Sequence, residues 1–191
     1  MRSPAAPLGQ LDDGDAEAAA RHGHHHLPHG AVGLRRGQLG GARSGKSSYA
    51  EKRARQASEK KVYIATCPVI DDEMERRIER HREARKESGW VTVEEPLHLE
   101  KALEEATRFP VIVVDCLTLW LNNLMFEATR TGSSVTEEEI TVRTESILRA
   151  ARRTGGTVLF VSNELGMGLV PGDAYSRRFR DLMGRCNQIV A

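Results

Sequence analysis

The chain has 191 residues, and its 28 Lys and Arg against 27 Asp and Glu leave a net charge of +1. A charge so balanced argues against nucleic acid or an acidic membrane surface as the partner. The sequence has no apolar run near the roughly 18 residues of a membrane span and no apolar core of a secretory signal. The three cysteines, Cys67, Cys116 and Cys186, are scattered singly, which fits a reducing compartment. We therefore expect a cytoplasmic protein of one domain's length.

Residues 1–38 differ in composition from the rest of the chain. They are rich in Ala, Gly, Arg and His, and they show neither helical nor strand periodicity. We expect a disordered or non-native leader there, with the folded domain at residues 39–191. The run AVGLRRGQL, residues 31–39, is broken by glycines and arginines and makes a poor central strand. Either a distorted strand forms, or this segment is not the native start of the protein.

Residues 40–47, GGARSGKS, fit the pattern G-x-x-x-x-G-K-[ST]. The glycines let successive backbone N–H groups converge on phosphate oxygens. Lys46 is expected to reach the outer phosphates, the Ser47 hydroxyl to bind Mg²⁺, and the following helix to direct its positive dipole end at the same anion. The alternative is a glycine-rich turn before an ordinary helix. The residues expected to bind nucleotide here are Gly40, Gly41, Ala42, Arg43, Ser44, Gly45, Lys46 and Ser47.

The next three elements are a helix, a strand and a second helix. Residues 47–60 have a small-residue helical face, residues 62–67 form a short β-rich run, and residues 71–86 open with acidic side chains, as a helix start prefers. The sparse apolar face of the last helix continues to His81 and Arg85. Both residues are therefore expected on its buried or site-facing side, the alternatives being a histidine that only packs its ring and a solvated arginine.

A second strand–helix–strand unit follows. Residues 90–94 read as a short strand, residues 97–107 as a helix, and residues 111–115, VIVVD, as a strand covered on both faces. The strand closes on Asp115, which in a chain with a phosphate loop is the expected second Mg²⁺-organising group. The alternative is an aspartate that caps the following turn.

The remaining pattern is helix, helix, strand and helix. Residues 117–126 are apolar nearly all round, so this helix is either deeply buried or part of a subunit interface. Thr136 followed by Glu139 is a capping box that opens the next helix. Residues 157–162 read as a buried strand and residues 175–190 as a final amphipathic helix.

Strands alternating with helices indicate an α/β domain of the P-loop NTPase type, with a mainly parallel sheet. Ligands of such sheets bind beyond the carboxyl ends of the strands, where Cys67, Asp115, Asn163 and Glu164 are expected beside the phosphate loop. The pattern alone therefore predicts a Mg²⁺-dependent nucleotide-binding domain that moves a phosphoryl or nucleotidyl group.

Several further blocks resemble one enzyme family. They are GGARSGKS, YIAT, DDEMERRIERHREAR, TVEEP, VVDCLTLWLNNL, SNELGMGLVP and RRFRDLMGRCNQ. In this order, over about residues 39–190, they resemble the bifunctional adenosylcobinamide kinase / adenosylcobinamide-phosphate guanylyltransferase family. The resemblance implies phosphorylation of adenosylcobinamide by a nucleoside triphosphate. It also implies transfer of GMP from GTP to that phosphate through a guanylyl-histidine, with release of pyrophosphate.

The same resemblance implies particular site residues. The histidine of the family's R-I-x-x-H segment falls on His81, and a neutral imidazole is able to attack the α-phosphorus of GTP. Catalysis is thus expected from His81 with Lys46, with Mg²⁺ as cofactor and GTP and ATP as substrates. Asn163 and Glu164 are expected to face the corrinoid or the metal. The further nucleotide-site positions are Thr66, Cys67, Arg85, Glu94 and Asp115.

The chain departs from the family pattern at both ends. Family members begin with an apolar strand that runs into the loop, and they continue past the last helix into one more strand, so the first and last strands here are expected to be missing or non-native. The resemblance also implies a homo-oligomer, a trimer in the best-known case, acting on small molecules and not on nucleic acid. Two alternatives stay open: a P-loop kinase of another small molecule, and an inactive nucleotide-binding fragment. The nucleotide preference of the kinase step also stays open.

Overall fold

The computed structural model describes residues 36–41, 44–68, 78–79, 82–83, 85 and 88–191. Over these residues the chain forms one five-stranded sheet in the order β1-β5-β4-β2-β3, and all four strand pairings are parallel. The strands are β1 (Arg36–Gly40), β2 (Lys61–Ala65), β3 (Trp90–Glu94), β4 (Val111–Asp115) and β5 (Thr157–Asn163). The predicted α/β class with a parallel sheet is confirmed.

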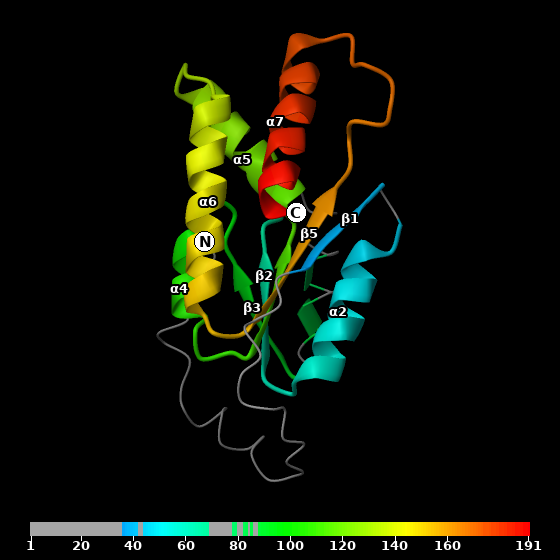
Figure 1. The fold of residues 1–191 in the computed structure, drawn as a ribbon, viewed down its shortest axis with the longest axis vertical. Helices are drawn as coiled ribbons and strands as arrows, with labels where there is room; N and C mark the ends of the chain where they lie inside the picture. The colour runs from blue at the N-terminus through cyan, green and yellow to red at the C-terminus, as the bar shows by residue number, and fades with distance from the viewer. Residues whose placement is uncertain (1–35, 42–43, 69–77, 80–81, 84, 86–87) are drawn as a thin grey trace.

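Helices cover both faces of the sheet, so the molecule has three layers (Figure 1). Helix α2 covers one face, and α4 to α7 cover the other. The helices are α2 (Lys46–Ala57), α4 (Leu99–Glu105), α5 (Leu117–Arg130), α6 (Glu137–Arg153) and α7 (Ala174–Val190). In the part of the chain that the structure describes, none of these helices has the length and hydropathy to cross a membrane.

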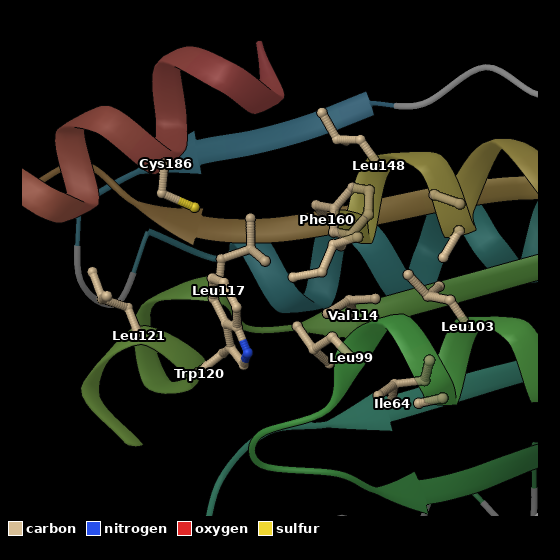
Figure 2. Packing of buried hydrophobic residues seen from close by; sticks show 14 of the residues in the cluster. Ile64, Leu99, Leu103, Val114, Leu117, Trp120, Leu121, Leu148, Phe160 and Cys186 are labelled. Atoms are coloured by element: carbon tan, nitrogen blue, oxygen red, sulfur yellow. The ribbon is translucent and has the colours of Figure 1, made fainter. Parts of the chain in front are cut away.

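Alternating side chains of the strands divide the core in two. Ile64, Val114 and Phe160 lie in the larger cluster, packed with α4 to α7 (Figure 2). Tyr63 and Val113 point to the opposite face, in the smaller cluster under α2. Because each central strand is buried on both faces, it needs the continuous apolar runs that the sequence shows.

The segment before the phosphate loop does form a strand, although its sequence is RGQLG. Its backbone pairs with β5 from Arg36 opposite Leu159 to Gly40 opposite Asn163, and in the described sheet β1 lies at the edge. An edge strand needs a backbone partner on one side only, so arginine and glycine are tolerated better there than in the centre. Of the two expectations for this segment, the formation of a strand is confirmed.

Local signals predicted most element boundaries to within a few residues. The hydroxyl oxygen of Thr136 accepts a hydrogen bond from the N–H of Glu139 at 3.0 Å, which confirms the capping box. Helix α5 buries much of its surface, which agrees with the first of the two alternatives for it, a deeply buried helix. It ends at Arg130, four residues after the predicted end. Of the predicted helix at residues 71–86, the structure describes residues 78–79, 82–83 and 85, and these are helical.

Candidate nucleotide site

Asp115 and Glu94 are the last residues of β4 and β3, so both lie at the carboxyl-terminal edge of the sheet. The strand register places Val161, Asp115, Ala65 and Glu94 in one row across β5, β4, β2 and β3. Residues in one row of a parallel sheet point to one face. That face is the one covered by α2, because Ala65 and Val161 belong to the cluster under α2. Two carboxylates therefore lie on the α2 face, separated by one strand or roughly 10 Å.

The phosphate loop starts at the same edge of the sheet. Gly40 ends β1 and lies opposite Asn163 at the end of β5. Strand β5 separates β1 from β4, so Asn163 is nearer in the sheet to the start of the loop than Asp115 is. The sequence correctly predicted that these residues share an edge, and the order of the strands came only from the structure.

Helix α2 begins directly after this loop, and no described side chain accepts a hydrogen bond from its first N–H groups. Gly45 precedes it in a left-handed conformation with φ of 81°, which favours glycine. Among the described residues no side chain caps α2, and its first turn contains no acidic residue. The N–H groups of Lys46, Ser47 and Ser48 thus meet neither a cap nor a carboxylate, and the helix dipole adds positive potential. This end of α2 is suited to binding phosphate.

Lys46 lies back over the loop that it follows. Its Nζ donates to the carbonyl oxygen of Gly41 at 2.5 Å and lies 3.4 Å from Oγ of Ser44. Ser47 is half-buried in the same turn of α2. The ammonium group and the Ser47 hydroxyl are therefore both close to the N-terminus of α2, as a phosphate loop requires.

Asp115 has one carboxylate oxygen in a hydrogen bond and, among the described residues, one oxygen without a partner. Its Oδ2 accepts a hydrogen bond from the hydroxyl of Tyr63. Oδ1 takes part in no hydrogen bond within the described part of the chain. Burial, and next the charge of Asp115, raise the pKa of the Tyr63 phenol, so the phenol keeps its proton and acts as the donor.

Arg85 is buried against the same tyrosine. Only 6% of Arg85 is exposed, and its guanidinium carbon lies 4.0 Å from the centroid of the Tyr63 ring, a cation–π contact. The Trp90 ring meets Tyr63 edge-on at 5.7 Å. Nε of Arg85 has no hydrogen-bond partner among the described residues. The alternative of a solvated arginine is wrong, and contact between Arg85 and phosphate stays a prediction.

Thr66 is fully buried and its hydroxyl is engaged by backbone. Oγ1 donates to the carbonyl oxygen of Cys116 at 2.8 Å and accepts from the N–H of Cys116 at 2.7 Å. Nδ2 of Asn123 donates to the carbonyl oxygens of Thr66 and Pro96, so the amide of this buried side chain has hydrogen-bond partners. The role predicted for Thr66 and the half-buried Cys67 in a nucleotide pocket stays a prediction, and the Thr66 hydroxyl ties β2 to β4.

Glu94 has a cationic neighbour at the rim of this region. Nη1 of Arg82 lies 3.8 Å from its Oε1, and both side chains are partly exposed. Such a pair adds little stability, because water screens it. Arg82 belongs to the same helical segment as Arg85, so the segment presents one guanidinium to Glu94 and one to Tyr63.

Three predicted site residues, Ala42, Arg43 and His81, lie outside the described residues. The role of His81 as nucleophile is therefore a prediction from the sequence. Conversely, sequence reasoning missed Tyr63. Alternation within YIA places Tyr63 and Ala65 on one face, but only the pairing of β2 with β4 brings the phenol to Asp115.

The open oxygen of Asp115 and the hydroxyl of Ser47 are hard oxygen donors. A divalent cation such as Mg²⁺ typically takes one or two carboxylates and fills its other positions with water and substrate phosphates. The described residues contain no group of three or more His, Cys, Asp or Glu side chains that would hold a metal on their own. The donors present thus fit a cation that arrives with a nucleotide.

Comparison with known proteins agrees with this geometry. Residues 38–191 match the sequence profile of the family described as cobinamide kinase / cobinamide phosphate guanyltransferase. The bifunctional adenosylcobalamin biosynthesis protein CobU of Escherichia coli K12 is 38% identical over 159 residues, which are 80% of this chain and 87% of that protein. CobP of Pseudomonas aeruginosa PAO1, with the same description, is 42% identical over 154 residues, 80% of this chain and 84% of that protein.

Among solved structures, the crystal structure of the RadB recombinase resembles the chain with a TM-score of 0.45 and 18% identity, over 81% of this chain and 72% of that one. A likeness of this size does not bear on function. The profile covers far more than half of the chain, and the two curated relatives exceed 30% identity over most of their length. The chain therefore belongs to the cobinamide kinase / cobinamide phosphate guanyltransferase family.

Proposed function

We propose that this chain phosphorylates adenosylcobinamide with a nucleoside triphosphate and then transfers GMP from GTP to the product. The products are adenosylcobinamide-GDP and pyrophosphate. The observation that carries the proposal is the uncapped N-terminus of α2, which lies at one sheet edge with Asp115 on the face that α2 covers. Family membership supplies the substrates, since the matching family is described by the two activities.

The residues at this edge support the kinase step. The N–H groups at the start of α2 would bind the phosphates of the triphosphate, and the Lys46 ammonium would neutralise charge on its outer oxygens. Mg²⁺ held by Asp115 and Ser47 would supply further charge neutralisation at the β- and γ-phosphates. Arg85, whose guanidinium lies over the Tyr63 ring, would offer Nε, which has no partner among the described residues, to a phosphate oxygen.

The guanylyl transfer proposed for His81 proceeds in two displacements. The neutral imidazole attacks the α-phosphorus of GTP, an N–P bond forms, and the bond to the leaving pyrophosphate breaks. A phosphate oxygen of adenosylcobinamide phosphate then attacks the same phosphorus, which breaks the N–P bond and restores the neutral imidazole. Cys67, Glu94 and the segment around Thr66 are proposed to flank the nucleoside. From the scattered cysteines we place the enzyme in the cytoplasm, and from the resemblance we propose a homo-oligomer.

Incubation with Mg²⁺ and GTP labelled at the α-phosphate tests this function. We expect covalent label that is labile in acid and stable in base, as a phosphoramidate is, and that is absent from His81→Ala. Lys46→Ala should also lose the label, because the loop that holds the triphosphate loses its cation. The exposed His98 provides a matched control, and His98→Ala should keep the label.

Two results would decide against parts of this proposal. Label that persists on His81→Ala would show that another residue is the nucleophile. A chain that binds GTP and phosphorylates adenosylcobinamide without any covalent label would exclude the guanylyl-histidine step. That second result would favour the kinase alone.

A further inference from the structure

Tyr63 is not among the site residues that the sequence predicts, and yet it contacts two charged residues of the candidate nucleotide site. It lies in the middle of β2 with only 5% of its surface exposed, and it faces α2. Its hydroxyl donates to Oδ2 of Asp115, on the neighbouring strand β4. Its ring face carries the guanidinium of Arg85 at 4.0 Å. One side chain thus contacts the carboxylate and the buried cation together.

The hydrogen bond decides which oxygen of Asp115 is available. Oδ2 already accepts a hydrogen bond from the phenol, and Oδ1 has no hydrogen-bond partner in the described part of the chain. A carboxylate on a single bond beyond Cβ otherwise rotates and offers either oxygen. Because the Tyr63 ring is packed against Trp90 and Arg85, its hydroxyl is itself held in place. The carboxylate therefore has one orientation imposed on it by its neighbour.

We propose that Tyr63 is a positioning residue that orients the Asp115 carboxylate, so that one chosen oxygen meets the Mg²⁺ of the bound nucleotide. The inference rests on the proposed function, because it requires a nucleotide site at this edge of the sheet. Residues that hydrogen-bond to metal-ligating carboxylates typically change metal affinity by about 10- to 100-fold when they are removed. Tyr63 acts through Asp115 and does not touch the substrate.

The substitution Tyr63→Phe removes the hydroxyl and keeps the ring on which Arg85 lies. We would titrate Mg²⁺ into the full chain with the α,β-methylene analogue of GTP, whose α–β linkage resists transfer of GMP. The apparent Mg²⁺ affinity should fall about tenfold in Tyr63→Phe. Binding of the analogue without Mg²⁺ should not change, because the loop and α2 are untouched. Tyr175, which is 44% exposed on α7, provides the matched control Tyr175→Phe, expected to behave like the parent chain.

A double-mutant cycle separates positioning from a general effect on the fold. If Tyr63 acts through Asp115, then Tyr63→Phe should cost nothing further once Asp115→Asn is present, since interacting residues are not additive. A purely structural tyrosine would add its full effect in that background, and this result would overturn the proposal. Melting of each variant by circular dichroism shows whether the chain remains folded.

Two other results would also overturn the inference, and they differ in what else they affect. A parent chain with Mg²⁺-dependent binding and a Tyr63→Phe variant with unchanged Mg²⁺ affinity would reject the positioning role and leave the proposed function intact. A parent chain that fails to bind the analogue, with or without Mg²⁺, would reject the nucleotide site itself and the inference with it.

Discussion

The hydroxyl of Thr66 offers the sharpest test of how the sheet edge is held together. Thr66 is 0% exposed, and its Oγ1 both donates to and accepts from the backbone of Cys116, which directly follows the neighbouring strand β4. The substitution Thr66→Val keeps the shape and removes both hydrogen bonds. The carbonyl oxygen of Cys116 keeps a second donor, the N–H of Trp120 at 3.1 Å. The N–H of Cys116 loses the acceptor that Thr66 provides, in a place closed to water.

The expected cost follows from these two bonds. A buried donor without a partner costs about 1–3 kcal/mol, and the lost bond to the carbonyl adds about 1 kcal/mol, so Thr66→Val should destabilise the fold by roughly 2–4 kcal/mol. For a domain of this size each kcal/mol lowers Tm by about 2–4 °C, which gives a fall of roughly 4–16 °C. Circular dichroism at 222 nm, with heating at constant pH and salt, measures this shift for the purified full-length chain.

Thr66→Ser is the matched control, because serine keeps the hydroxyl and loses one methyl group at a cost of about 1 kcal/mol. We expect Thr66→Ser to melt above Thr66→Val. A Thr66→Val variant that melts within about 2 °C of the parent chain, or above Thr66→Ser, would refute the argument that this hydroxyl satisfies the Cys116 backbone.

Two further predictions concern the titrating groups of the fold. Hydrogen bonds from Ser176 lower the pKa of the Asp173 carboxyl below its ordinary 3.8, so the cap of α7 stabilises the chain above pH 3.8 and is lost as the pH falls through the lower folded value. The substitution Asp173→Asn keeps a hydrogen-bond acceptor that does not titrate. Below pH 3.8 the Tm of the parent chain should therefore fall relative to the Tm of Asp173→Asn. A difference in Tm between the two chains that stays constant with pH would contradict this. Burial raises the pKa of the Cys116 and Cys186 thiols to about 11, so both stay protonated and unreactive at about pH 8. The native chain should therefore take up about one equivalent of iodoacetamide, at Cys67, the cysteine that is not buried. Cys67→Ser should take up none, and modification of native Cys186 in a peptide map would show the expectation to be wrong.

Short-range patterns in the sequence were enough for much of the fold. The phosphate loop, the capping box at Thr136 and the continuous apolar runs of β4 and β5 depend on residues within one turn or one strand, so they can be read without knowing the partners. The same reasoning placed Arg85 on the inner side of its helix, and Arg85 is indeed buried. The segment RGQLG has only a weak strand pattern, so the sequence did not predict it clearly. It forms β1 because β5 provides the partners for its backbone hydrogen bonds.

The contacts that build the candidate site join residues far apart in the chain. The hydroxyl of Tyr63 meets a carboxylate 52 residues later, and the Thr66 hydroxyl meets the backbone of Cys116 across 50 residues. Which strands are neighbours decides both contacts, and no local propensity encodes that order. The sequence by itself therefore determined the phosphate loop, the parallel α/β class and the chemistry available. Only the tertiary structure decided that Tyr63 holds Asp115, because strand pairing is a property of the whole sheet.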